Sequence, residues 1–295
     1  MTKNRLKKNK QQRKDRFKTS LFIAPSFIGA AVFFILPFFV VAYYSVIDNP
    51  ISREFIGLAN FENLLRNPIF RMAAKNTAIF SATAVPLAVV IPLLFAILLM
   101  RKIPLGSFFK TVLISPLMVP TASVVLIWEV LFHYEGTINN FLVDFGIDRI
   151  DFFKSDWSLL VIVCLFLWKN IGYNMILFMA ALASIPKDVT EACMLDGAGA
   201  FRTFFKIKLP YIFSSILFVT ILSLISSFKI FREVYLMTGN YPYEKLYTLQ
   251  HFMNNTFSSL DYQKLSAAAI IMCAVMVVII GTLFIIDDKV GRDIE

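Results

Sequence analysis

The chain has few of the side chains from which catalytic and metal sites are built. Only 3 of its 295 residues are cysteine and only 2 are histidine. Cys164, Cys193 and Cys273 are far apart in the sequence, so they support neither a disulfide framework nor a metal site. No Ser/His/Asp set can be assembled, and the Gly-rich loop ending in Gly-Lys-Ser/Thr that binds nucleotide phosphates is missing. We therefore expect no catalytic residue, no metal and no cofactor bound by this chain.

The sequence also lacks the period-two alternation of apolar and polar residues that a membrane β-barrel needs. It has long continuous apolar runs instead, with 58% hydrophobic residues and a mean hydropathy of +0.69. A helix of roughly 20 apolar residues crosses about 30 Å of hydrocarbon, so these runs predict an all-α polytopic membrane protein with six transmembrane helices. The predicted spans are 20–47, 77–100, 107–132, 157–183, 210–232 and 264–286.

Prolines interrupt several of these predicted spans. They are Pro37, Pro86, Pro92, Pro116 and Pro120. Neighbouring helices in a membrane protein can satisfy the backbone groups that a proline frees. We therefore expect kinks at these positions and not the ends of spans.

Acidic residues are in the minority, with 20 Asp and Glu against 29 Lys and Arg and a formal net charge of +9. The excess is concentrated in residues 1–18, where nine basic residues accompany a single acid, Asp15. This tail directly precedes the first span, so it is a positive-inside signal and a contact for anionic membrane lipid, and not a nucleic-acid arm. The apolar stretch from Leu21 to Val46 is longer than a signal-peptide core, so we interpret it as a retained span.

Charge also orients the remaining connections. Basic residues mark the second-to-third and fourth-to-fifth connections as cytoplasmic, whereas residues 133–156 are acidic, as an external loop can be. The predicted organisation is a basic cytoplasmic tail at 1–19, a six-span domain at 20–287, and a cytoplasmic C-terminus at 288–295. External connections at 48–76, 133–156 and 233–263 have the composition of short helices and turns.

The connection at 184–210 is the most distinctive segment. Asp188 to Leu195 is good helix-forming material, with Ser184 as a candidate cap, and Gly197 and Gly199 end that helix. A second helical segment follows, whose phenylalanines alternate with basic residues before Pro210. The segment is therefore predicted to be a helix, a bend and a helix on the cytoplasmic side.

This loop resembles the signature cytoplasmic loop of ABC importer permeases, which reads Glu-Ala-Ala, three residues to Asp-Gly-Ala, and an Ile-x-Leu-Pro ending. The matching positions are Glu191, Ala192, Asp196, Gly197, Ala198, Ile207, Leu209 and Pro210, and Cys193 replaces the second Ala. Four further segments resemble carbohydrate-importing permeases in the expected order: 55–68, 108–132, 168–186 and 227–239. The chain is similar to the compact relatives of the maltose and glycerol-phosphate permeases, since it lacks the extra N-terminal spans and the large external insertion of the maltose permease.

The resemblance implies a permease subunit that moves a sugar or oligosaccharide across a bacterial or archaeal cytoplasmic membrane by alternating access. It also implies three kinds of partner: a second homologous permease, two ATP-binding subunits that hold ATP and Mg, and an extracytoplasmic sugar-binding protein. Contact with the ATPase falls, by resemblance, on Glu191, Ala192, Asp196, Gly197 and Ala198.

A substrate path is expected along the polar residues of the fourth and fifth spans, because such groups are expensive against lipid. The expected path residues are Trp168, Asn170, Tyr173, Asn174, Ser223, Ser227 and Lys229. An aromatic ring beside amides and hydroxyls suits a sugar. The alternatives are that Lys169, Lys229 and Arg232 snorkel to an interface, and that the serines, Ser226 included, permit close helix packing. Lys229 with Arg232 also leaves open an anionic substrate, such as a glycerol-phosphate-like sugar derivative.

Two other classes of membrane protein remain in competition. An ion-coupled secondary transporter needs intramembrane acids, and Glu129 is the only acid that we expect within reach of a span. A non-transporting scaffold does not account for the ordered 184–210 loop. His133 and His251 are expected to be interfacial or exposed.

Overall fold

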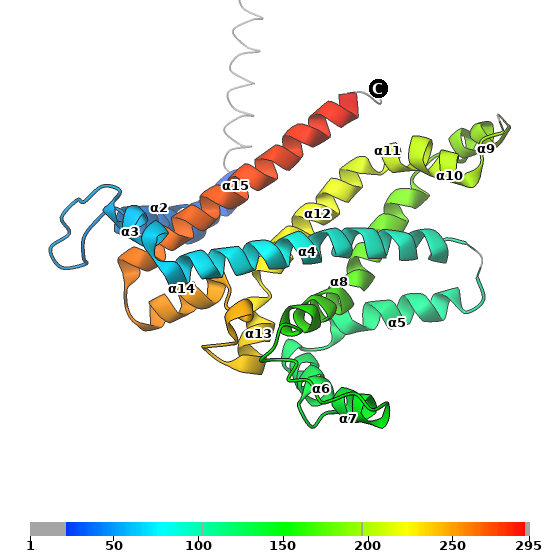
Figure 1. Cartoon of the computed structure of the whole chain (residues 1–295). Coiled ribbons are helices and arrows are strands. Elements are labelled where there is room, and N and C mark those ends of the chain that lie inside the picture. Colours follow the sequence, from blue (N-terminus) through cyan, green and yellow to red (C-terminus); the bar gives the residue numbers. More distant parts are fainter. Residues whose placement is uncertain (1–21, 102, 196, 293–295) are drawn as a thin grey trace, which may run out of the picture. The chain divides into compact units, whose positions relative to one another are not determined.

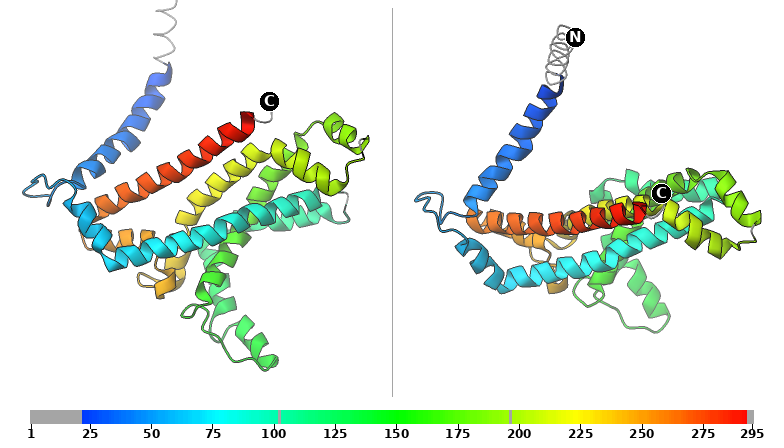
Figure 2. Two further views of the ribbon diagram at one scale, coloured as in Figure 1. Left: turned by 45° about the horizontal axis from the view of Figure 1, so that its top comes forward. Right: turned by 90° about the horizontal axis from the view of Figure 1, so that it is seen from above.

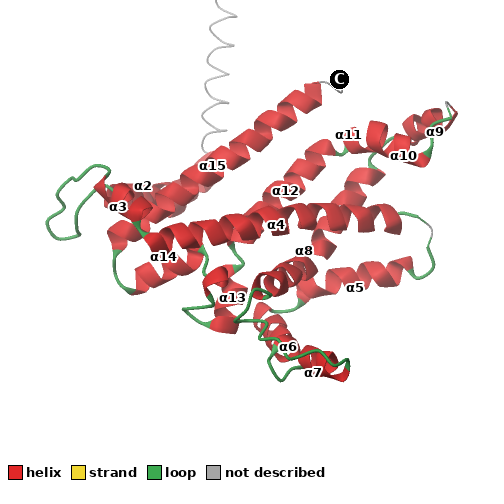
Figure 3. Ribbon diagram, viewed as in Figure 1, coloured by secondary structure: helices red, strands yellow, loops and turns green. Residues whose placement is uncertain are grey.

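The computed structural model describes residues 22–101, 103–195 and 197–292. The predicted tail at 1–19, Lys102, Asp196 and residues 293–295 lie outside this part. The described residues are nearly all helical, and their only extended pairing is an isolated bridge between Ile47 and Phe55 (Figure 3). Five of the helices described are long and apolar enough to cross a membrane, or six if one bent pair counts as a single span. The prediction of an all-α polytopic membrane protein is confirmed.

The chain divides into two compact units, of which the first holds the described residues up to Leu64 together with Leu260–Met272. It contains the span Phe22–Tyr44, where a π-helical turn at Ala31–Ile35 passes into α2 at Leu36–Tyr44. The following loop is closed by local hydrogen bonds, among them Asn60 Nδ2 to the carbonyl of Ile47 at 2.8 Å. The unit also holds most of α3 (Ala59–Arg66) and the beginning of α15 (Tyr262–Arg292).

The second unit, Leu65–Ser259 with the rest of α15, holds the other helices (Figure 1). Its long helices are α4 (Pro68–Leu99), α5 (Gly106–Met118), α6 (Thr121–Phe132), α8 (Ser158–Ala183) and α12 (Phe213–Phe228). Shorter helices are α7 (Thr137–Asp144), α13 (Phe231–Thr238), the 3-10 turn at Glu244–Leu246 and α14 (Leu249–Ser258). Helix α8 contacts α4, α5 and α12, which makes it the central helix of this unit.

Helix α4 begins nine residues earlier than the sequence predicted. Asn67 caps it, because its side-chain oxygen accepts hydrogen bonds from the amides of Ile69 at 2.9 Å and Phe70 at 3.1 Å. Pro68 occupies the first turn, where its missing N–H costs nothing. Pro86 and Pro92 lie inside the helix without ending it, as expected.

At Pro120, where we expected a kink and not the end of a span, one helix ends and another begins. The predicted span 107–132 consists of two helices, α5 and α6 (Figure 2). The bent pair, Gly106–Met118 with Thr121–Asp144, has an angle of 105° at this break. Val119 has extended angles (φ −84°, ψ 131°), the conformation that a following proline favours. Pro116, inside α5, does not end its helix.

The fifth span also differs from its prediction of 210–232. It runs from Phe213 to Thr238 and is interrupted by a turn at Lys229 and Ile230, which separates α12 from α13. The fourth span, predicted at 157–183, is α8 at Ser158–Ala183, and the sixth lies within α15. The connections at 48–76, 133–156 and 233–263 contain short helices, as their composition predicted.

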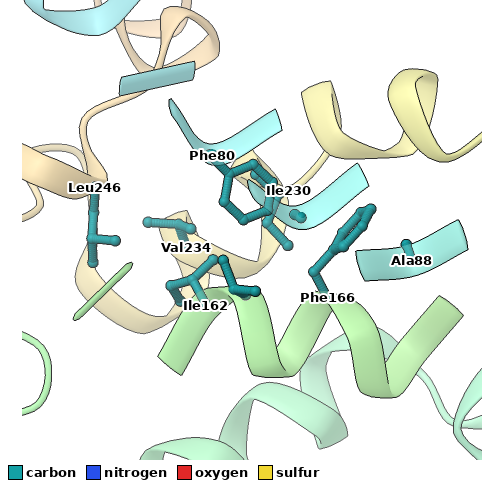
Figure 4. Close-up of a cluster of buried hydrophobic side chains, with 9 residues drawn as sticks. Phe80, Ala88, Ile162, Phe166, Ile230, Val234 and Leu246 are labelled. Carbon is teal, nitrogen blue, oxygen red and sulfur yellow. The ribbon is translucent and has the colours of Figure 1, made fainter. Parts of the chain in front are cut away.

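Two apolar clusters hold the second unit together. The first joins Phe80 of α4, Phe166 of α8 and Val234 of α13, with the rings of Phe80 and Phe166 edge to face at 5.5 Å (Figure 4). The second gathers Ala96 and Phe178, near the C-terminal ends of α4 and α8, with Ile212, which directly precedes α12. Gly172 allows α8 to approach α5, because a Cβ there would lie 2.1 Å from the carbonyl oxygen of Leu113.

Candidate functional site

A cavity of ≈ 470 Å³, which we call the central cavity, opens where α5, α6, α8, α12, α13 and α14 meet. Its lining combines apolar side chains with amides, hydroxyls and charges. The lining residues are Leu117, Thr121, Phe166, Lys169, Asn170, Ser226, Lys229, Ile230, Phe231, Arg232, Glu233 and Gln250. The turn between α12 and α13 and the first residues of α13 contribute five consecutive residues, from Lys229 to Glu233, and with them three of the four charged side chains of the lining.

Two of the charged residues in the central cavity form an ion pair. Lys169 of α8 donates to Glu233 of α13, and the two side chains are 21% and 9% exposed. Lys169 also lies 3.4 Å from the hydroxyl of Thr121. Lys229 and Arg232 are exposed, and the described part of the chain shows no carboxylate paired with either. The cavity lining therefore carries two cations that no acid of the described residues neutralises.

Glu233 corrects the expectation that Glu129 is the only acid within reach of a span. The predicted fifth span ended one residue before Glu233, whereas the observed span continues to Thr238. A positive charge at Lys169 within an apolar helix was the available signal, because such a charge needs a partner. Because Lys169 pairs with Glu233, its charge is balanced within the chain, and the alternative that Lys169 snorkels to an interface is not needed.

The expected path residues separate into two groups. Asn170 and Lys229 line the central cavity, together with Ser226 and Arg232. The side-chain nitrogen of Asn170 donates to the carbonyl of Phe166 at 2.7 Å. Its side-chain oxygen can still accept a hydrogen bond from another group.

The second group lies between helices. Asn174 is 2% exposed and its amide nitrogen donates to the carbonyl of Ala88 at 2.7 Å and to the hydroxyl of Ser223 at 3.0 Å. Ser227 is 1% exposed and hydrogen-bonds Ser81 at 2.8 Å. These contacts join α4, α8 and α12, and none of Asn174, Ser223 and Ser227 lines the central cavity.

The two aromatic path candidates are on the surface of α8. Trp168 is 38% exposed and its ring centroid lies 6.2 Å from that of Trp128. Tyr173 is 41% exposed and stands one helical turn beyond Lys169, so the two share a face of α8.

A second cavity of ≈ 390 Å³ lies at the other end of α13 and includes Glu129, His133 and Tyr241 in its lining. His133 is exposed, as expected, but the expectation for His251 is wrong, because it is completely buried. Its Nδ1 lies 2.9 Å from the hydroxyl of Thr248 and accepts the Thr248 amide at 3.3 Å, which closes the first turn of α14. Burial lowers the pKa of His251 to about 4.

The 184–210 loop has the predicted helix, bend and helix. The first helix is α9 (Lys187–Leu195), and Gly197 follows with φ +75°, a left-handed conformation that suits glycine. The Ala198 amide donates to the carbonyl of Cys193 at 3.0 Å, which closes the end of α9. Ser184 does not cap α9, since its hydroxyl donates to Ala181 at the end of α8.

The second half of the loop is a chain of short helical turns. It comprises α10 (Ala200–Thr203), a π-helical turn at Phe204–Lys208 and α11 (Leu209–Tyr211). Glu191 and Ala192 are exposed on α9, and Ala198 is half-buried. Leu195 and Phe201, on either side of the bend, are 90% and 77% exposed. The loop therefore presents both charged and apolar side chains, which is the character of a docking surface.

Comparison with known proteins places these features in a family. Residues 56–294 match the family model described as binding-protein-dependent transport system inner membrane component. The sn-glycerol-3-phosphate transport system permease protein UgpA of Escherichia coli O6:K15:H31 (strain 536) is 30% identical over 272 residues, covering 90% of this chain and 92% of that protein. The sulfoquinovosyl glycerol transport system permease protein SmoG of Agrobacterium fabrum is 31% identical over 267 residues, covering 88% and 87%.

Solved structures show the same fold. A chain from the crystal structure of a bacterial ABC transporter involved in the import of the acidic polysaccharide alginate has a TM-score of 0.82 at 21% identity, and the match covers 97% of this chain and 99% of that one. The family model covers most of the chain and the curated relatives match along nearly their whole length. This chain therefore belongs to the family of inner-membrane components of binding-protein-dependent transport systems.

Proposed function

We propose that the chain is the permease subunit of an ATP-driven importer that moves a sugar or oligosaccharide across the cytoplasmic membrane by alternating access. The observation that carries the proposal is the exposed helix–bend–helix of the 184–210 loop, with Gly197 at φ +75° in its bend. A short helix of this kind can lie in a groove of a partner, with its apolar side as anchor and its polar side fixing register. The sequence has no nucleotide-binding loop of its own, so energy reaches the chain through contact.

In this proposal, Glu191 and Ala192 on α9 contact a separate ATPase subunit, and Gly197 and Ala198 hold the bend. Asp196 completes the set by resemblance, although it lies outside the described residues. ATP and Mg are bound by two ATPase subunits, not by this chain. The loop, the basic tail and both termini are cytoplasmic, because the basic connections mark that side.

The proposed assembly also contains a second, homologous permease and an extracytoplasmic sugar-binding protein. No residue in the most apolar part of the first span, Phe22–Tyr44, or of the last, Tyr262–Lys289, is buried within the chain. These surfaces are available to lipid and to a partner subunit. A solved structure of the alginate transporter in complex with an alginate pentasaccharide-bound periplasmic protein, similar to this chain with a TM-score of 0.80 at 21% identity, supports the binding-protein partner.

We place the substrate path along the face of α8 that carries Lys169, Asn170 and Tyr173, continuing to Lys229 of the central cavity. Trp168 borders it on the adjacent face. Asn174, Ser223 and Ser227 act behind the path, where their hydrogen bonds set the spacing of α4, α8 and α12.

An anionic sugar derivative is a second candidate for the cargo. Lys169 is balanced by Glu233, but Lys229 and Arg232 have no acidic partner in the described part of the chain. Two cations at a cavity attract a phosphate or carboxylate by charge-assisted hydrogen bonds. Two similar proteins bear names that refer to sn-glycerol 3-phosphate and to an acidic polysaccharide, which agrees with this candidate. An ion-coupled secondary transporter is not proposed, because the family works with binding proteins.

The proposed function is tested by uptake into proteoliposomes that contain the complete transporter. Uptake of a labelled carbohydrate should require both internal ATP and the external binding protein, and should be insensitive to a proton or sodium gradient. Uptake that persists without ATP, or that follows an ion gradient, would contradict the proposal.

The two candidate cargoes are separated by the double variant Lys229→Gln/Arg232→Gln. If the cargo is anionic, uptake of a labelled anion such as sn-glycerol 3-phosphate should fall at least tenfold, because each charge-assisted hydrogen bond is worth about 1.5–3 kcal/mol. If the cargo is neutral, uptake of a neutral oligosaccharide should change less than about threefold. The matched control is Arg53→Gln/Lys75→Gln, which removes the same charge from two exposed positions that line none of the three cavities.

A further inference from the structure

A third cavity, of ≈ 840 Å³, lies between the 184–210 loop and the membrane helices, and we call it the loop cavity. Its walls are the last two turns of α4, the end of α8, and the turns that follow Gly197. The lining residues are Leu94, Ile97, Met100, Arg101, Leu182, Ala198, Ala200, Phe201, Thr203, Phe204, Phe205 and Lys208. Its volume is in the range of pockets that hold small ligands, about 300–1,000 Å³.

The loop cavity has apolar walls and two cations in its lining. Its aliphatic and aromatic side chains come from all three walls, and Phe201 and Phe205 pack together with ring centroids 4.5 Å apart. Arg101 follows the end of α4 and Lys208 ends the π-helical turn, so the two cations stand where the helices leave the apolar region. Among the described residues of the lining, no acid accompanies them. A ligand for this cavity must therefore combine an anionic group with apolar chains.

The backbone of the loop is irregular at the same place. Phe204–Lys208 forms a π-helical turn, a conformation that is rare and frequent at functional sites. This turn supplies three of the lining residues, namely Phe204, Phe205 and Lys208. The irregular turn therefore directs two rings and a cation to the same cavity.

We propose that the loop cavity binds one anionic membrane phospholipid. Its phosphate lies between Arg101 and Lys208, and its acyl chains lie against the apolar residues of α4, α8 and the π-helical turn. An ammonium or guanidinium group at a membrane surface favours anionic lipid by roughly fivefold per charge, so both together favour it by about thirtyfold. A bound lipid would brace the loop against α4 and α8 at the point where the proposed contact with the ATPase begins.

The test uses the complete transporter purified in detergent and measures retained lipid by native mass spectrometry. The probes are phosphatidylglycerol and phosphatidylcholine with matched acyl chains. Wild type should retain one phosphatidylglycerol that phosphatidylcholine does not replace. The variant Arg101→Gln/Lys208→Gln should lower the affinity for phosphatidylglycerol by about thirtyfold, whereas Arg101→Lys/Lys208→Arg should preserve it.

A matched control is provided by Arg202→Gln/Lys206→Gln, which removes two neighbouring cations that do not line the loop cavity. It should change the affinity less than about threefold, and inorganic phosphate should not displace the lipid. Equal retention of the two lipids, an equal loss in the control variant, displacement by inorganic phosphate, or a complex that retains no lipid would each overturn the proposal. The readout counts lipid and not uptake, so its failure is distinct from failure of the proposed transport function.

Discussion

At the scale of single residues, Lys169 and Glu233 form an ion pair between two helices of the second unit. Lys169 is 21% exposed and Glu233 is 9% exposed, so removing one partner leaves a largely buried charge. The pair joins α8 to α13 across the central cavity and so fixes the side of the fifth span that carries Lys229 and Arg232.

We expect Glu233→Gln to destabilise the folded chain by about 3 kcal/mol, because Lys169 keeps its charge without a partner. The double variant Lys169→Met/Glu233→Leu should recover most of that loss, since apolar replacement of both partners is often neutral. A double-mutant cycle on the free energy of unfolding in mixed micelles measures the coupling. Additive single and double losses would show that the contact contributes little.

His251 gives a pH dependence whose sign follows from its burial. Its pKa in the folded chain is about 4, below the 6.5 of an unperturbed histidine, so the unfolded chain takes up a proton first as the pH falls. Stability should be complete above pH 6.5 and decline toward pH 4, by at most about 3 kcal/mol.

The measurement is unfolding in detergent across this pH range, for wild type and for His251→Asn. An Asn oxygen can accept the Thr248 amide in place of Nδ1 but does not titrate, so the decline should become shallower. A slope that His251→Asn does not alter would assign the pH dependence to other groups.

At the scale of elements, close packing of α8 determines how the second unit is built. A Cβ at Gly172 would meet the Leu113 carbonyl oxygen at 2.1 Å and the Ile114 Cα at 2.7 Å, both of them backbone atoms. Backbone atoms cannot move aside as a flexible side chain can, so α5 and α8 would have to separate.

Gly172→Ala should therefore lower stability by about 1–3 kcal/mol through overpacking. Gly281→Ala, on α15, is the matched control, since no atom lies within 4 Å of its added Cβ. It should be neutral or stabilising by up to about 1 kcal/mol, because alanine favours a helix over glycine. Thermal unfolding of both variants in one detergent measures the difference, and two changes of the same sign would contradict the packing argument.

The elements also show which features the sequence could predict. Spans with uninterrupted apolar runs, such as α8, were predicted to within a residue, and the bend at Gly197 followed from a glycine that φ +75° requires. The breaks inside the third and fifth spans could not be predicted, because hydropathy counts apolar residues and does not register where the backbone turns. The break at Pro120 and the turn at Lys229 leave the apolar pattern unchanged while redirecting the chain.

The sequence predicted which types of residue form the candidate site, but not which of these residues contact one another. Polar residues of the fourth and fifth spans were expected to share one path, yet Asn174 and Ser223 bond to each other and to α4, whereas Lys169 bonds to Glu233. Which face of a helix a polar residue occupies depends on the tertiary packing around it. The predicted fifth span ended one residue before Glu233, whereas the observed span continues to Thr238, so the prediction omitted this acid.

At the scale of the whole molecule, the proposed orientation can be tested with a cysteine-free background, made by replacing Cys164, Cys193 and Cys273 with alanine. A cysteine at Ser52, in the loop that we propose to be the first external one, should react with a membrane-impermeant maleimide added to intact cells. A cysteine at Asp188, on α9, should react only after the membrane is opened. Both positions are exposed, so labelling reports the side and not burial. The reverse pattern would invert the topology.

The central claim is that the 184–210 loop transmits the work of a separate ATPase to the substrate path. Gly197 and Gly199 offer a matched pair, because neither has an atom within 4 Å of an added Cβ, but Gly197 has φ +75° and Gly199 has φ −65°. Valine at Gly197 strains the bend by roughly 1–2 kcal/mol, whereas valine at Gly199 does not.

The deciding measurement is the number of substrate molecules imported per ATP hydrolysed, in proteoliposomes that contain the complete transporter. We predict that Gly197→Val assembles with the ATPase and hydrolyses ATP but imports at least tenfold less substrate per ATP, while Gly199→Val stays near wild type. An unchanged ratio of uptake to hydrolysis in a correctly assembled Gly197→Val transporter would contradict the account.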